Sequence, residues 1–329
     1  MKLMKHLLKL FSLAIVLIVF CSGKEKSSFT LVILPDTQTY IEEYPEIFNS
    51  QTSWIAKNAK DFAFVLHQGD ITDDNNDQQW KIVADGFSLM DGKVPYTFVP
   101  GNHDTGEGGH TMDRNTDLMN KFLPYSKYSK QRSFGGAFIP GEMANTWHTF
   151  KAGGYNWLIL SLEFGPRDKV LDWAASIIEK HSKHKIIINT HAYLYSDNTR
   201  MGQKKDHKWR PQEYGVGKNV GPDAVNDGDQ MWEKLIKKYP NIMFVFCGHV
   251  CNDGTGTLVS EGVHGNKVYQ MLANYQGGVE GTEKGGNGFL RLIKIDPENS
   301  RISVKTYSPY IDKYKTESDQ QFTFENVKF

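Results

Sequence analysis

Cysteine is scarce in this chain of 329 residues. The three cysteines are Cys21, Cys247 and Cys251, and only the last two lie beyond the N-terminal segment. A small scaffold built on disulfides needs several paired cysteines, so this class of protein is excluded. Cys247 ends an apolar run and is most simply a core residue, whereas Cys251 lies two positions after His249.

An excess of charge of one sign is also missing. Lys and Arg total 38, Asp and Glu total 38, and the formal net charge is zero. Because binding to a phosphate backbone needs a basic face, we expect no nucleic acid partner. The one dense basic stretch, residues 204–210, is either a solvated loop or a loop that meets an anionic substrate.

Long apolar runs are absent apart from one near the N-terminus. Residues 11–20 are apolar except for Ser12, and three lysines precede them. This pattern is typical of an export signal and is short for a membrane span, which needs about 20 apolar residues. Cys21 follows at once, and the arrangement resembles a bacterial lipoprotein signal in which this cysteine becomes the lipidated first residue.

We therefore expect residues 1–28 to be an export signal and tether, and residues 29–329 to form a single domain. The expected location is the cell envelope, with a membrane as partner through a lipid on Cys21. Phe20 stands where such signals usually have a small residue. Cleavage near Gly23 with release and an uncleaved anchor are therefore the alternatives.

Five short apolar runs each end in side chains that bind metals or transfer protons. Short continuous apolar runs indicate strands buried on both faces. They are Leu31–Leu34 before Asp36 and Gln38, Phe62–Leu66 before Asp70 and Asp73, Val94–Val99 before Asn102, His103 and Asp104, Ile186–Ile188 before His191, and Ile242–Phe246 before His249 and Cys251. We expect these polar groups to gather at one edge of one sheet and to bind divalent cations.

The spacing of apolar residues predicts the other elements. Helices are expected at 45–60, 77–90, 168–180 and 230–238. Their alternation with strands implies parallel strands joined by right-handed crossovers. Two further strands are expected at 146–151 and 155–162. In the last part of the chain, a series of strands at 258–263, 268–274, 289–295 and 302–307 indicates antiparallel pairing. The expected fold class is α/β, with a second sheet packed on the first and helices outside.

Residues 195–226 form a long segment of low apolar content that begins four residues after His191. Loops of this length are usually functional or disordered, so we interpret the segment as a lid or substrate wall, with a decorative insertion as the alternative. Aromatic residues in and near it either line a pocket or pack in a core; they are Tyr193, Tyr195, Trp209 and Tyr275.

The ordered set of motifs resembles the calcineurin-like metallophosphoesterases. The set is Asp36-x-Gln38, Gly69-Asp70-x-x-Asp73, Gly101-Asn102-His103-Asp104, His191 and Gly248-His249-x-Cys251. The resemblance implies a four-layer αββα sandwich, with two mixed sheets flanked by helices, and a centre of two divalent ions. The identity of the ions, Mn, Fe, Zn or Mg, is left open.

The resemblance also implies a role for each motif residue. Asp70 would bridge both ions, Asp36 would bind the first, and Asn102, His191 and His249 would complete the second site. His103 would contact the substrate and assist its leaving oxygen, and Asn102 would also face the substrate. Asp73 or Asp104 would orient His103.

Two positions depart from the usual pattern of the family. Gln38 and Cys251 stand where histidines are usual at the first metal. An amide oxygen suits Mg, Ca or Mn, whereas a thiolate favours Zn or Fe. Exported bacterial members of the family carry Asp-Thr-Gln in the first motif, so Gln38 fits a subgroup. The first site is expected to be altered, and weaker or exchangeable.

The function implied is an exported, metal-dependent phosphoester hydrolase, a phosphatase or phosphodiesterase. It would use a metal-activated hydroxide, with His103 assisting the leaving group. Its substrate would be a phosphorylated small molecule, lipid or polymer. The alternative is a non-catalytic envelope protein that binds a phosphorylated ligand through one retained metal site.

Overall fold

The computed structural model describes residues 28–277 and 279–329. The predicted signal peptide and Cys21 lie outside these residues. Within the described ranges, none of the helices has the length and apolar content that a bilayer span requires.

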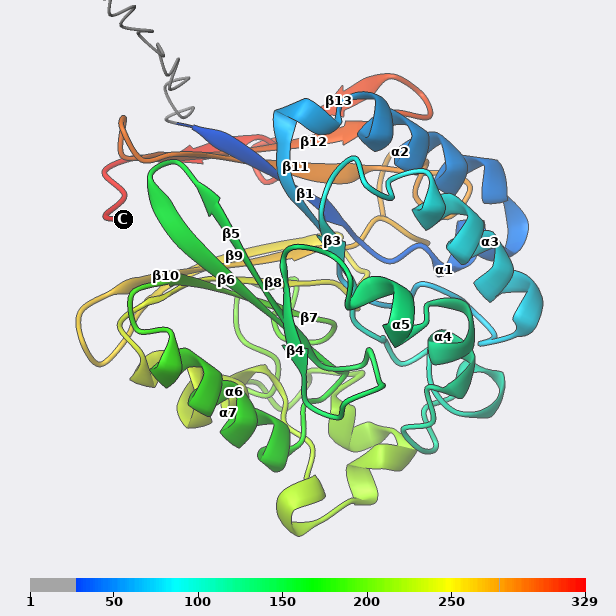
Figure 1. Ribbon diagram of the computed structural model, residues 1–329, viewed down its shortest axis with the longest axis horizontal. Helices are drawn as coiled ribbons and strands as arrows, with labels where there is room; N and C mark the ends of the chain where they lie inside the picture. The colour runs from blue at the N-terminus through cyan, green and yellow to red at the C-terminus, as the bar shows by residue number, and fades with distance from the viewer. Residues whose placement is uncertain (1–27, 278) are drawn as a thin grey trace, which may run out of the picture.

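Two seven-stranded mixed sheets face each other, and helices cover the outer side of each (Figure 1). The first sheet has the order β13-β12-β11-β1-β2-β3, with β14 beside β12, and the second has the order β4-β5-β6-β7-β8-β10-β9. The strands are β1 Phe29–Leu34, β2 Phe62–His67, β3 Tyr96–Thr97, β4 Phe134–Ala137, β5 Thr146–Ala152, β6 Tyr155–Leu162, β7 Lys185–Thr190, β8 Ile242–Cys247, β9 Thr255–Glu261, β10 Lys267–Ala273, β11 Leu290–Asp296, β12 Arg301–Ser308, β13 Lys313–Lys315 and β14 Phe322–Phe324.

The helices pack in two groups, one on each outer face. The α-helices are α1 Gln38–Glu43, α2 Pro45–Lys57, α3 Asp77–Ser88, α4 Asp117–Phe122, α5 Tyr125–Tyr128, α6 Asp168–Lys180 and α7 Gly228–Lys234. Short 3-10 helices are Ala59–Asp61, Glu107–Gly109, Pro211–Glu213, Gly215–Lys218, Gly221–Asp223 and Ile236–Lys238. Figure 1 shows α2 and α3 against the first sheet and α6 and α7 against the second.

Three apolar layers hold the sandwich together. Between the sheets, Leu31 and Ile33 of β1 pack in one cluster with residues such as Phe244 of β8. A second cluster joins the first sheet to α2 and α3, and a third joins the second sheet to α6 and α7. Each central strand therefore buries both of its faces, which is why these strands have continuous apolar sequences. This arrangement confirms the predicted αββα fold class.

The prediction that all five polar clusters lie at one edge of one sheet is wrong. β1, β2 and β3 are parallel neighbours in the first sheet, whereas β7 and β8 are parallel neighbours in the second. The clusters meet because the two sheets are stacked with the carboxyl ends of these strands on the same side. An apolar run has the same sequence in either sheet, so its pattern does not reveal which sheet it joins.

Several predicted elements differ in extent. The strand expected at 94–99 is reduced to β3, because Pro95 and Pro100 flank it and proline lacks the N–H that a ladder needs. The antiparallel series in the second half is divided: β9 and β10 join the second sheet, and β11 and β12 join the first. β10 also pairs in parallel with β8, so that series is not wholly antiparallel.

Candidate metal centre

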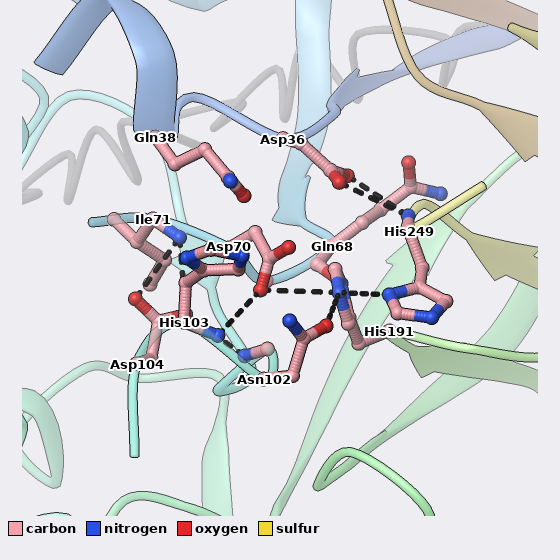
Figure 2. Close-up of polar contacts among 12 residues, drawn as sticks. Asp36, Gln38, Gln68, Asp70, Ile71, Asn102, His103, Asp104, His191 and His249 are labelled. Carbon is pink, nitrogen blue, oxygen red and sulfur yellow. Dashed lines mark hydrogen bonds and ion pairs between the residues drawn. The ribbon is translucent and has the colours of Figure 1, made fainter. Parts of the chain in front are cut away.

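Four ligand atoms from four different loops converge on one point between the sheets (Figure 2). Nε2 of His191 lies 3.1 Å from Oδ1 of Asp70, 3.1 Å from Oδ1 of Asn102 and 3.0 Å from Nδ1 of His249. All four side chains are buried. The sites predicted after β2, β3, β7 and β8 are therefore brought together by the fold.

The outer nitrogen of each imidazole is held by a backbone carbonyl. Nδ1 of His191 lies 2.8 Å from the oxygen of Gln68, and Nε2 of His249 lies 2.7 Å from the oxygen of Trp209. Since a carbonyl can only accept, each of these nitrogens carries the proton and donates it. In neutral His191 the inner nitrogen Nε2 has a lone pair, as Nδ1 of His249 does, and the two nitrogens face each other and two oxygens. This arrangement suits a cation, either a second proton on His191 or a metal ion that displaces that proton.

The electrostatics of the site favour positive charge at this point. Burial lowers the pKa of His191, but the carboxylates of Asp70 and Asp36 outweigh it and raise this pKa to about 9. Burial and the neighbouring His191 lower the pKa of His249 to about 3. For Asp70, burial raises the pKa, but His191 and His103 hold it well below its usual range. Asp70 is therefore an anion surrounded by neutral or cationic donors.

Two glycines allow the carboxylates to approach the backbone. A Cβ atom at Gly101 would lie 2.0 Å from Oδ1 of Asp70, and one at Gly248 would lie 2.1 Å from Oδ1 of Asp36. Two of the candidate ligands also have a left-handed backbone, because Asp70 has φ 46° and His249 has φ 75°. A left-handed backbone in residues other than glycine is costly and is often found at functional sites.

The first-metal residues lie beside this cluster, and they fit a cation in part. Both carboxylate oxygens of Asp36 accept from the backbone N–H of His249 at 3.1 Å. The amide nitrogen of Gln38 donates to Oδ1 of Asp73 at 3.0 Å, and this fixes its Oε1, which is buried without a partner among the described residues. Cys251 is half-buried at the same cavity. Gln38 therefore offers the oxygen that the sequence suggested.

Two residues of this region were missed. Asn274 donates from its amide to Oδ2 of Asp36 at 2.9 Å, and Gln276 does so at 3.3 Å. The amide of Asn274 also approaches Sγ of Cys251 at 3.7 Å. Both residues follow the apolar strand β10, so the signal used for the other five strands was present in the sequence here too.

His103 is held by Asp73 rather than by Asp104. Nδ1 of His103 lies 2.8 Å from the backbone oxygen of Asp73 and 3.4 Å from its Oδ1. Asp104 accepts from the backbone N–H groups of Ile71, Thr72 and Gly101 at 2.8 to 3.1 Å. Within residues 28–277 and 279–329, Asp104 makes no hydrogen bond to His103. Of the two carboxylates predicted to orient His103, only that of Asp73 contacts it. Asp104 instead joins the loop after β2 to the loop after β3, and we call it a clamp between these two loops.

A cavity of about 360 Å³ lies beside the candidate metal ligands. It is bounded by Gln38, Thr39, Asp70, Asn102, His103, Trp209, Tyr214, His249, Cys251, Gln276 and Gly277. Trp209 and Tyr214 belong to the long segment 195–226, so this segment does form a wall of the site. Tyr193 and Tyr275, by contrast, are buried and pack in the core.

Comparison with known proteins agrees with this geometry. Residues 29–253 match the calcineurin-like phosphoesterase family. The uncharacterized protein YvnB of Bacillus subtilis (strain 168) is 31% identical over 303 residues, which are 89% of this chain and 21% of YvnB. The probable glycerophosphodiester phosphodiesterase GpdQ of Arcobacter nitrofigilis is 21% identical over 188 residues, 56% of this chain and 55% of that protein. The chain thus spans about a fifth and about half of the length of these curated relatives.

A solved structure shares the fold at low identity. The purple acid phosphatase PPD1 from yellow lupin seeds superposes with a TM-score of 0.55 and 15% identity, over 91% of this chain and 54% of that one. The family predicted from the five motifs is therefore confirmed by the match over residues 29–253. The chain belongs to the calcineurin-like phosphoesterase family.

Proposed function

We propose that this protein is a metal-dependent phosphoester hydrolase. The observation that carries the proposal is the convergence of Asp70, Asn102, His191 and His249 on one point, with both imidazoles held so that their lone pairs face inward. Four lone pairs this close repel one another unless positive charge lies among them, and the raised pKa of His191 indicates that such charge is favoured there, as a proton or as a metal ion that displaces it. The cavity in front of them leaves room for a ligand.

The residues fit divalent ions, and their chemistry suits phosphoryl transfer. Asp70, Asn102, His191 and His249 would hold one ion, and Asp36, Asp70 and Gln38 a second, weaker one. Bound there, such ions supply positive charge that neutralises phosphoryl oxygens and acidifies water. Imidazole and amide ligands are neutral, so the centre keeps net positive charge for an anionic substrate.

His103 provides the proton for the leaving oxygen. Its Nδ1–H donates to the backbone oxygen of Asp73, and the ring borders the cavity, so Nε2 can carry a second proton there. Burial lowers the pKa of His103, but Asp70 and Asp73 outweigh it and raise this pKa above 6.5. The raised pKa favours the protonated form of His103, which suits a general acid.

The second candidate function is binding of a phosphorylated ligand without turnover. It is favoured by the loss of two usual histidines at the first metal, Gln38 and Cys251 being in their places. The held geometry of His103 speaks for an enzyme, because a pure binder needs no proton donor. The test is hydrolysis of p-nitrophenyl phosphate and its bis ester with Mn²⁺, Zn²⁺ or Mg²⁺. Metal-loaded wild type that hydrolyses neither ester faster than His103→Ala is a binder.

We also propose export and a lipid anchor at Cys21. The support is the sequence alone: a basic start, an apolar run over residues 11–20 and a cysteine directly after it. The chain expressed in full should fractionate with membranes, and Cys21→Ser should release it. Equal membrane partition of both forms would contradict the anchor.

A further inference from the structure

The segment from Trp209 to Tyr214 brings two aromatic side chains to the metal cavity. It belongs to the long loop between β7 and α7, which includes short 3-10 helices but no strand. The wall of the site nearest the imidazole of His249 therefore comes from a loop, where families vary their sequences most freely. A loop in this position can determine which substrates are accepted.

The backbone of Trp209 is fixed on both sides. Its N–H donates to Oε2 of Glu213 at 2.8 Å, and its carbonyl oxygen accepts from Nε2 of His249 at 2.7 Å. The residue has φ 62°, a left-handed conformation that bulky side chains rarely adopt. The carbonyl contact is available to any residue type, and glycine or asparagine would adopt this φ with less strain. The backbone therefore gives no reason for tryptophan at this position.

The indole of Trp209 forms no hydrogen bond and no ring stack among the described residues. It is 38% exposed, one of seven large hydrophobic residues exposed among the described parts of the chain. Within residues 28–277 and 279–329, its N–H has no hydrogen-bond partner and its ring stacks on no other aromatic ring. A strained, exposed tryptophan beside a metal centre is explained if a ligand covers it.

Tyr214, in the same wall of the cavity, is held in place by aromatic packing. Its ring packs edge-on against Phe164 at 5.0 Å, and Phe164 contacts the rings of His191 and His249 at 5.7 and 5.3 Å. Thr39 and Gln276, which line the cavity and are not among the proposed metal ligands, are also uncharged. Among the described residues that line the cavity, none is Lys or Arg. Arg210, the neighbour of Trp209, is paired with Glu213 at 3.0 Å.

We propose that the indole of Trp209 is the binding face for an uncharged ring in the ester group of the substrate. The inference rests on the proposed function, since the phosphoryl group is taken to lie at the metal centre. The ring would lie against the indole, and its polar substituents would meet the amide of Gln276 and the hydroxyl of Thr39. Substrates of this class include sugar and aryl or nucleoside phosphoesters.

The test measures ring preference by equilibrium binding, which does not depend on turnover. The Mn²⁺-loaded full chain is titrated calorimetrically with methyl-, cyclohexyl- and phenylphosphonate, which share one anionic head. Aromatic stacking supports about a tenfold tighter binding of phenylphosphonate than of methylphosphonate by the wild type. Trp209→Ala should reduce this ratio to about one, and Trp209→Phe should keep most of it. If cyclohexylphosphonate binds as tightly as phenylphosphonate, the indole accepts a non-planar ring such as a sugar. If only phenylphosphonate binds more tightly than methylphosphonate, the indole prefers a planar ring.

Matched controls separate the indole from the loop. Val220→Ala removes another exposed apolar side chain of the same loop, and it should leave the ratio unchanged. Metal content of each variant is measured, because Trp209 also holds His249 through its carbonyl. The inference is overturned if Trp209→Ala, with its metal retained, keeps the wild-type ratio, or if the wild type shows no ring preference. Ring preference in a protein that hydrolyses no ester would instead refute the proposed function and leave this inference standing.

Discussion

Asp104→Asn tests whether Asp104 is a clamp between ligand loops or a partner of His103. One carboxylate oxygen accepts from the N–H of Thr72 at 2.8 Å and from its hydroxyl at 2.9 Å. The other accepts from the N–H of Gly101 at 2.8 Å, and the N–H of Ile71 reaches both oxygens. The side chain is fully buried, so water cannot replace a lost contact.

Asparagine has the same shape but only one oxygen. Its amide nitrogen must face either Gly101 or Thr72, so at least one hydrogen bond to a charged acceptor is lost and two donors are left in contact. A hydrogen bond to a charged group contributes about 1.5–3 kcal/mol, and an unpaired buried donor costs about 1–3 kcal/mol. We therefore expect Asp104→Asn to lower the free energy of unfolding by about 3 kcal/mol.

The assay is urea unfolding of the metal-free protein, so that lost metal binding does not contribute to the result. The expected result is a lower midpoint at an unchanged slope. The matched control is Asp73→Asn at a half-exposed carboxylate, which should change the midpoint far less. An unchanged midpoint for Asp104→Asn, together with a loss of hydrolysis, would refute the clamp and restore the role in proton transfer.

Three further predictions concern the proton donor and the first metal site. His103→Gln should lower kcat by about 10²–10⁴-fold while bound metal, measured by elemental analysis, stays the same; parallel loss of metal would contradict its role as proton donor. The pKa of His103 is raised from its usual value of 6.5. His103 therefore stays protonated to a higher pH than a free histidine and loses its proton as the pH rises through the raised pKa. The alkaline limb of the kcat profile should therefore move to lower pH in Asp73→Asn, and an unmoved limb would argue against their coupling. In the metal-free protein, burial and the carboxylates of Asp36 and Asp70 raise the pKa of the Cys251 thiol to about 12, which disfavours the thiolate that a metal would bind. Cys251→Ser should therefore leave the Zn²⁺ and Mn²⁺ content at pH 7 unchanged, and loss of one ion per chain would show that the thiol is a ligand.

The convergence of the candidate ligands could be predicted because each follows a strand with an apolar sequence. A run such as Ile242–Phe246 is recognisable from its letters, and the polar residue after it must lie at the carboxyl edge of a sheet. The spacing of apolar residues in α6 likewise gave both of its ends correctly. These features are local, so a single sequence contains them.

What could not be predicted depends on contacts between distant segments. The pairing of β10 with β8, and the division of the ligand strands between two sheets, are set by packing that no short pattern records. The resemblance left open whether Asp73 or Asp104 orients His103, and only the fold shows that the carboxylate of Asp104 turns toward Ile71 and Thr72. Trp209 could not be placed, because its contact with His249 joins residues 40 positions apart.

The claim on which the account depends is that Asp70, Asn102, His191 and His249 together hold a cation. The most direct measurement is elemental analysis of the wild type and of Asp70→Asn, each incubated with Mn²⁺ or Zn²⁺ and then desalted. We expect at least one retained ion per wild-type chain and almost none in the variant, with both proteins folded by circular dichroism. A folded wild type that retains no ion, or a variant that retains as much as the wild type, would contradict it.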